Sequence, residues 1–191
     1  MDAPPARYMG RTALQAACEG GHVAVAERLL AAGAEVDEPA AWSSGRTALQ
    51  AAAEGGHGDV VRLLLGRGAR VEVRLGKYKG LSALQGAAGS GRVEVVERLL
   101  EAGAEVNAEG SYYGGCTALY AAAEKGHARV VEVLLDRGAD VFQTAGNKGW
   151  TPNQVATFRG HVEIASRLRE EEEKARGMRR AGTRVKSASL F

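Results

Sequence analysis

One unit of sequence recurs along this chain at an almost fixed period. Successive units open on a glycine, and the steps between these glycines are 35, 35, 35 and 34 residues. The five opening residues are Gly10, Gly45, Gly80, Gly115 and Gly149. A unit of this length is one supersecondary element that cannot bury its apolar face alone and becomes stable by stacking on its neighbours. The period therefore predicts an array of five stacked repeats, here called units one to five, and it indicates binding as the class of function.

Each unit has the pattern of two helices joined by a tight turn. A Thr or Ser two positions after the opening glycine can cap the first helix, and an alanine-rich segment such as ALYAAAE in unit four favours that helix. A glycine followed by His or Arg, such as Gly126-His127, then reverses the chain. The apolar stripe of the second helix in unit four consists of Val130, Val131, Val133, Leu134 and Leu135. Gly138 ends this helix, and we expect a short strand, AEV or ADV in sequence, to follow it.

This pattern resembles the ankyrin-repeat family, whose repeat of about 33 residues carries a TPLHxA signature. The resemblance covers residues 8–169, with TALQ or SALQ in units one to three, TALY in unit four and TPNQ in unit five. It implies an all-α, ankyrin-type solenoid of five helix-turn-helix repeats with long β-hairpin fingers. It also implies that a partner binds to the fingertips and to the concave face formed by the first helices. Glutamine stands where the family has histidine and can still form a hydrogen bond, at Gln15, Gln50, Gln85 and Gln154.

We divide the chain into a lead-in of residues 1–9, a repeat array of residues 10–169, and a helix extension with a tail in residues 170–191. The pairs Glu170–Lys174 and Glu172–Arg176 have the favourable i,i+4 order, so we expect the last helix to reach about Arg176. Past Gly177 the high charge and low apolar content predict disorder. The tail also contains short patterns that resemble a basic-directed kinase site and a PDZ-domain ligand.

The terminal units differ from the inner ones in the second helix. Unit one has Val25-Ala26 and unit five has Ile164-Ala165, where the three inner units have two valines. A terminal unit lacks a neighbour on one side and is expected to reduce its exposed apolar surface. We interpret units one and five as the caps of a complete array, with ordinary variation between units as the alternative.

Five of the seven Trp and Tyr residues lie in the predicted finger loops, at Tyr8, Trp42, Tyr78, Tyr112 and Tyr113. Tyr and Trp are enriched at binding hot spots, although these rings could equally pack on one another and stiffen the fingers. In the second finger Lys77 and Lys79 flank Tyr78, which gives that loop a basic tip. On the concave face, the positions that the family leaves variable are Arg11, Arg46, Glu54, Lys125, Trp150 and Phe158.

The charge distribution limits the class of partner. The net charge is only +2, and acidic units on both sides of the basic second unit interrupt any basic stripe, which disfavours nucleic acid. We therefore expect a protein partner. The alternatives are a basic finger that binds nucleic acid or a phosphorylated ligand, and a structural spacer that presents the tail. No apolar run approaches the roughly 20 residues of a membrane span, so we expect a protein of the cytoplasm or the nucleus. We also expect it to be a monomer.

The sequence contains no pattern of catalytic or metal-binding residues. The four histidines occupy the same place in different units, so they lie at least one stacking step apart and cannot share a zinc ion. Phosphate-loop and nucleophile motifs are also absent. We expect neither an enzyme nor a bound cofactor or metal. Cys18 and Cys116 lie three units apart, too far for a disulfide, and should be free thiols.

Overall fold

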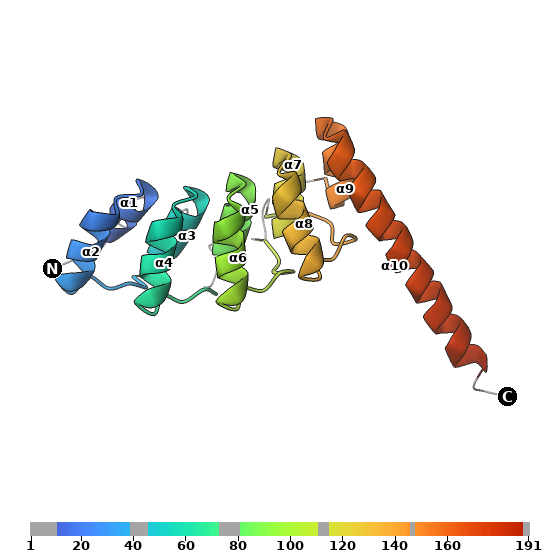
Figure 1. Ribbon diagram of the computed structural model, residues 1–191, viewed down its shortest axis with the longest axis horizontal. Helices are drawn as coiled ribbons and strands as arrows, with labels where there is room; N and C mark the ends of the chain where they lie inside the picture. Colours follow the sequence, from blue (N-terminus) through green and yellow to red (C-terminus); the bar gives the residue numbers. More distant parts are fainter. Residues whose placement is uncertain (1–10, 39–45, 73–80, 111–114, 146–147, 189–191) are drawn as a thin grey trace.

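The structure, a computed structural model, describes residues 11–38, 46–72, 81–110, 115–145 and 148–188, with side chains in the last segment as far as residue 178. Within these residues the helices form five consecutive pairs that stack side by side in chain order (Figure 1). The pairs are α1 (Ala13–Glu19) with α2 (Val23–Ala31), α3 (Ala48–Glu54) with α4 (Gly58–Gly66), α5 (Ala83–Ser90) with α6 (Val93–Glu101), α7 (Ala118–Lys125) with α8 (Ala128–Asp136), and α9 (Pro152–Arg159) with α10 (Val162–Ala188). This confirms the predicted all-α solenoid of helix-turn-helix repeats.

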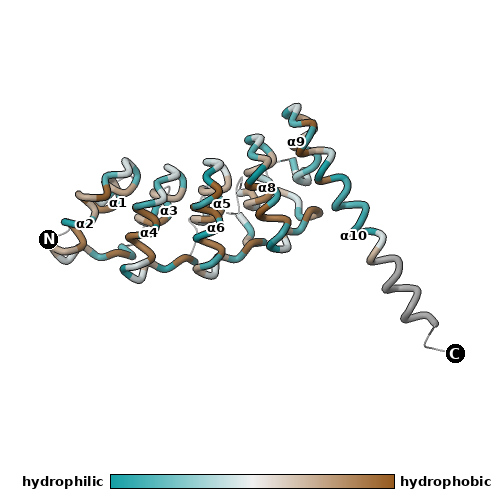
Figure 2. Tube along the Cα trace, viewed as in Figure 1, coloured by the Kyte–Doolittle hydropathy of each residue, from teal (hydrophilic) through white to brown (hydrophobic). Residues whose placement is uncertain are grey.

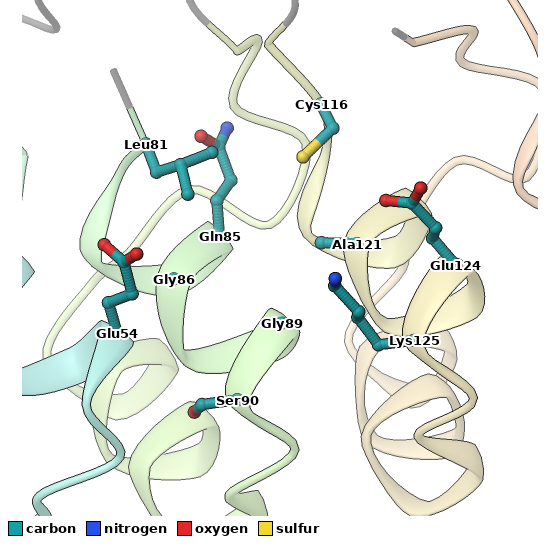
Figure 3. A pocket seen from close by; sticks show the side chains of 10 residues that line it. All are labelled: Glu54, Leu81, Gln85, Gly86, Gly89, Ser90, Cys116, Ala121, Glu124 and Lys125. Carbon is teal, nitrogen blue, oxygen red and sulfur yellow. The ribbon is translucent and has the colours of Figure 1, made fainter. Parts of the chain in front are cut away.

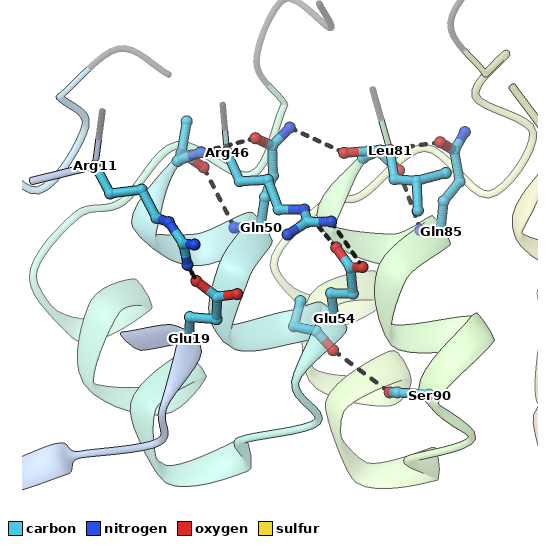
Figure 4. Close-up of polar contacts among 11 residues, drawn as sticks. Arg11, Glu19, Arg46, Gln50, Glu54, Leu81, Gln85 and Ser90 are labelled. Carbon is cyan, nitrogen blue, oxygen red and sulfur yellow. Dashed lines mark hydrogen bonds and ion pairs between the residues drawn. The ribbon is translucent and has the colours of Figure 1, made fainter. Parts of the chain in front are cut away.

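The first helix of each unit begins at the predicted Thr or Ser cap. In unit two the Thr47 hydroxyl accepts a hydrogen bond from the Gln50 backbone amide, and the Gln50 side chain accepts one from the Thr47 amide. The Gln50 side-chain amide also donates to the backbone carbonyl of Leu81, at 3.0 Å (Figure 4). Gln15 and Gln85 repeat both interactions. The glutamine therefore caps its own helix and also fixes a later segment of backbone.

The core runs through the stack as one continuous layer. Val60, Val61 and Leu64 of α4 are fully buried, and the equivalent residues of α6 and α8 are buried to the same degree. In α2, by contrast, only Ala26 is buried, and Val25 is 49% exposed. Figure 2 shows the apolar segments within the helix pairs, whereas α10 is largely hydrophilic. The low burial of α2 agrees with the terminal position of unit one in the stack.

Histidine side chains join neighbouring units. The sequence suggested only a role in the turn, but the His57 Nε2–H donates to the carbonyl of Glu19 in the preceding unit, at 2.8 Å. His127 and His161 make the same bond to the unit before them. Each ring also lies close against a glycine of positive φ, such as Gly91 beneath His127. The histidine contacts therefore fix the distance between neighbouring units.

The bases of the finger loops differ from the prediction. The segments after Gly33, Gly103 and Gly138 form turns and irregular backbone instead of short strands, and the described residues contain only an isolated antiparallel bridge between Ala145 and Trp150. Side chains take the backbone N–H groups that a strand would have paired. The Asp37 carboxylate accepts from the Arg70 amide at 3.0 Å, and equivalent bonds join units two and three and units three and four.

The last helix is longer than the sequence suggested. It extends through Gly177 to Ala188, whereas the sequence predicted disorder after Gly177. An interior glycine costs a helix only about 1 kcal/mol, and the Met, Arg and Ala residues that follow are good helix formers. The Glu172–Arg176 pair is present at 3.6 Å, whereas Lys174 pairs with Glu171 at 2.9 Å instead of Glu170. Within the described residues, no helix is both long and apolar enough to cross a membrane.

The packing of the terminal and inner units predicts unequal stability losses at one repeat position. Val60→Ala should lower the free energy of unfolding by about 1.5 to 3 kcal/mol, because it removes fully buried apolar volume. Val25→Ala at the equivalent position should cost less than about 1 kcal/mol, because that side chain is 49% exposed. Urea denaturation of both variants measures the difference. Equal losses would show that α2 is covered on its outer side in solution.

The histidine contact predicts a larger effect for one glycine than for another. Gly91→Ala should destabilise the protein by about 3 kcal/mol, because φ is +74° and the new Cβ would lie 2.5 Å from the His127 ring. Gly33→Ala is the control: its φ is +89°, no atom lies within 4 Å of the new Cβ, and the cost should be about 1 kcal/mol.

A double-mutant cycle separates backbone strain from the contact between units. In a His127→Ala background the additional cost of Gly91→Ala should fall to that of Gly33→Ala, because the colliding ring is gone. If the cost of Gly91→Ala did not change in that background, the histidine would not set the distance between these units.

Candidate functional site

The first helices line the inner side of the array. Helices α1, α3, α5, α7 and α9 pack closely on one another, whereas the second helices α2, α4, α6 and α8 approach one another less. Closer packing on one side bends a stack toward that side, so the first helices form the concave face. Small residues permit this approach: a Cβ on Gly86 of α5 would lie only 3.2 Å from the Glu54 Cβ and 3.3 Å from its backbone.

Two repeat positions, eight residues apart, face each other on the concave face and differ between units. We call them the inner-face pair. The first follows the opening glycine and the second lies near the end of the first helix. From unit one to unit five the pairs are Arg11 with Glu19, Arg46 with Glu54, Leu81 with Gly89, Cys116 with Glu124, and Trp150 with Phe158.

In units one and two the inner-face pair is an ion pair. Arg11 binds Glu19, and the Arg46 guanidinium holds Glu54 through two contacts, Nε to Oε2 at 2.6 Å and Nη2 to Oε1 at 2.9 Å (Figure 4). All four side chains are more than one third exposed, so each pair contributes at most about 1 kcal/mol to stability. Their main effect is that this part of the concave face is polar but carries no net charge from these four side chains.

In unit three both members of the pair lack charge, and the surface is hollow there. Leu81 replaces the arginine and Gly89 replaces the glutamate. The hollow has a volume of about 220 Å³ and lies between α3, α5 and α7 (Figure 3). Ser90 turns its hydroxyl to the Ala87 carbonyl at 2.8 Å. The side chains and backbone that line this unit-three hollow include Glu54, Leu81, Gly86, Gly89, Cys116 and Lys125.

The rim of the unit-three hollow carries one cation without an ion pair. Glu54 is held by Arg46, and Glu124 is bound by Arg159 of the next unit. Lys125 is exposed and makes no ion pair with any of the residues that the structure describes. Two glutamates and one lysine thus lie at the rim, and both glutamates are already paired within the chain.

Cys116 contributes an uncharged wall to the hollow. Burial, with a smaller contribution from Glu124, raises the pKa of its thiol to about 11, and burial raises the pKa of Cys18 to about 12. Both thiols are free, as predicted from the sequence. Because the thiol stays protonated near neutral pH, Cys116 is a weakly polar surface and a poor nucleophile. Among the described residues no group of His, Cys, Asp and Glu side chains is arranged to hold a metal ion.

In unit five the inner-face pair is aromatic. The rings of Trp150 and Phe158 lie 4.9 Å apart, centroid to centroid, and are tilted by 58°. Lys148 places its ammonium group 4.3 Å from the centre of the Trp150 ring and 5.0 Å from that of Phe158. Phe158 is 63% exposed. We call these three residues the unit-five cluster.

The structure describes only some of the predicted partner-binding residues. Six lie on the concave face, but the charged ones in units one and two are neutralised within the chain: Arg11, Arg46, Glu54, Lys125, Trp150 and Phe158. The finger residues lie outside the described residues: Tyr8, Trp42, Lys77, Tyr78, Lys79, Tyr112 and Tyr113. Sequence reasoning missed Leu81, Gly89 and Lys148. The signal for the first two was the change from RTALQAAAE in unit two to LSALQGAAG in unit three.

Comparison with protein families agrees with this architecture. Three copies of the family model for ankyrin repeats match residues 2–75, 36–110 and 84–177. A search of the curated proteins finds no significant match. Ankyrin repeats generally act as modules for protein–protein interaction and are typically not enzymes. With the family model matching most of its length, the chain belongs to the ankyrin-repeat family.

Proposed function

We propose that this protein binds another protein on its concave face and that the unit-three hollow accepts one large apolar side chain of that partner. The observation that carries the proposal is the inner-face pair. In units one and two its two positions hold charged, paired side chains, whereas in unit three they hold the uncharged Leu81 and Gly89 beside a hollow of about 220 Å³. A cavity of roughly 150 Å³ already accommodates a benzene ring, so one leucine or aromatic side chain fits.

The hollow favours binding because it forms without a partner. Gly86 brings α5 against Glu54 of α3, and the Ser90 hydroxyl already donates to the Ala87 carbonyl. An apolar side chain that enters gains about 1.5 to 3 kcal/mol from burial. Little ordering of the protein opposes this gain, because most of the lining residues lie on α3, α5 and α7. The ion pairs of units one and two then serve as a polar rim.

The finger residues remain part of the proposal. Aromatic fingertips beside the concave face would enlarge the contact area, and Tyr78 and Tyr113 are the best candidates by residue type. A basic second finger would instead bind nucleic acid or a phosphorylated ligand, and that binding would weaken steeply with salt. Binding to the unit-three hollow should depend little on salt, so the two possibilities differ in a simple titration.

Filling the hollow should abolish binding without unfolding the protein. Gly89 lies in α5 and does not have a positive φ. A Cβ added there would have no atom within 4 Å, so a side chain can be accommodated. Gly89→Leu should therefore keep or slightly raise stability, by up to about 1 kcal/mol, while its side chain occupies the hollow. Gly66→Leu is the matched control, since Gly66 also lies in a helix with open space around its Cβ but sits on α4, away from the hollow.

The experiment is a selection of phage-displayed random peptides on the full chain, followed by titration of the selected peptides. Peptides should carry a large apolar residue, bind the Gly66→Leu variant like the wild type, and lose at least about tenfold in affinity for Gly89→Leu. Equal binding to both variants would rule out the hollow as the anchor. Binding that falls steeply with salt and is unchanged in Gly89→Leu would favour the basic finger instead.

A further inference from the structure

We propose that the partner is an extended, acidic segment that uses two anchors, one in the unit-three hollow and a second on the unit-five cluster. This inference rests on the proposed function, because it assigns the chemistry of the segment that fills the hollow. The segment carries a large apolar residue at one end, an aromatic residue at the other, and one or more carboxylates between them.

The spacing of the two anchors follows from the repeat. Gly89 and Phe158 occupy the same position in units three and five, and Figure 1 shows α7 between α5 and α9. Packed helices lie about 8 to 10 Å apart, so two steps along the stack cover about 16 to 20 Å. An extended chain rises about 3.3 Å per residue. The two anchor residues of the segment are therefore about five or six positions apart.

The unit-five cluster has the properties of a second anchor. Phe158 takes the place of the glutamates in units one, two and four, and it exposes 63% of its surface. Its ring lies 4.9 Å from that of Trp150, centroid to centroid, so the two rings form one aromatic surface. An aromatic side chain of the partner can add to this pair in a tilted or offset arrangement, which contributes about 0.5 to 1.5 kcal/mol beyond the area it buries.

The charges between the anchors favour carboxylates in the segment. Glu124, which lies between them, is already bound by Arg159. Lys125 makes no ion pair among the described residues, and Lys148 lies over the two rings of the cluster without one. A segment that crosses unit four thus passes Lys125 and meets Lys148 at the second anchor, and neither ammonium group is neutralised by a described carboxylate. Acidic residues there gain attraction, and lysines in their place are repelled.

Synthetic peptides test the spacing directly. A fluorescein-labelled peptide with a leucine, a tryptophan about six positions later and two aspartates between them is titrated against the full chain by fluorescence anisotropy. A second peptide lacks two residues of the spacer, which keeps the side chains on the same face but shortens the span by about 7 Å. A third has lysines in place of the aspartates. The second and third peptides should bind about tenfold more weakly than the first.

Variants of the protein separate this inference from the function on which it rests. Phe158→Glu installs the residue that units one, two and four carry and alters an exposed side chain, so thermal unfolding should change little. It should weaken the first peptide about tenfold and leave the shortened peptide unchanged. Lys125→Glu should also weaken the first peptide, whereas Arg129→Glu, a charge reversal on exposed Arg129 of α8, should not.

The outcomes are distinguishable. If Gly89→Leu abolishes binding while Phe158→Glu and the shortened spacer have no effect, the hollow is an anchor and the second anchor is wrong. If Gly89→Leu has no effect, the proposed function itself fails. Equal or tighter binding of the lysine peptide would overturn the assignment of an acidic segment.

Discussion

The stacking of units is the interaction on which the rest of this structure depends. Leu64, Leu99 and Leu134 are fully buried, and they sit in helices of two turns or a little more, a length at which an isolated helix is unstable in water. Units two, three and four could therefore not keep their second helices folded alone. Burial between neighbours supplies that stability, while histidine-to-carbonyl bonds and the close fit at Gly86 fix the distance between neighbours. Residues that do not take part in stacking are free of these requirements.

In units one and two the side chains of the inner-face pair form ion pairs within one unit and contribute little to stacking, which explains how this pair can differ so much between units. An exposed ion pair such as Arg46–Glu54 adds little to stability, so the stack tolerates its replacement. Unit three holds Leu81 and Gly89 instead and keeps its core intact, with Leu84, Ala87 and Ala88 fully buried. Unit five holds an aromatic pair at the same place. The array thus combines an almost uniform core with a concave face whose chemistry changes from charged to hollow to aromatic along its length.

The sequence was informative wherever one residue type decides the local structure. The Thr and Ser caps, the reversing glycines and the valine and leucine stripes gave the helix pairs and their order, and Gln50 forms a hydrogen bond as expected where the family has histidine. Predictions failed where a contact with another part of the chain decides the local structure. Asp37 takes the Arg70 amide that a strand would have needed, and α10 continues through Gly177 because one glycine is too weak a signal to end a helix without a terminating contact. The unit-three hollow is found only by comparing one repeat position between units. Leu81 and Gly89 lack the charged side chains that Arg46 and Glu54 have in unit two.

The position of the hollow in the middle of the array links binding to the stability of the stack. Its walls come from α3, α5 and α7, so a side chain that fills it touches three consecutive units at once. Separating any two of these units would break contacts with the ligand as well as the core between them. A ligand that binds only the stacked form stabilises that form. The gain in free energy grows with the logarithm of the ratio of the ligand concentration to the dissociation constant. The segment that crosses from unit three to unit five would extend this effect over α9 as well. Recognition and stacking then support each other, because the same close approach of the first helices that excludes water from the core also shapes the surface that the partner reads.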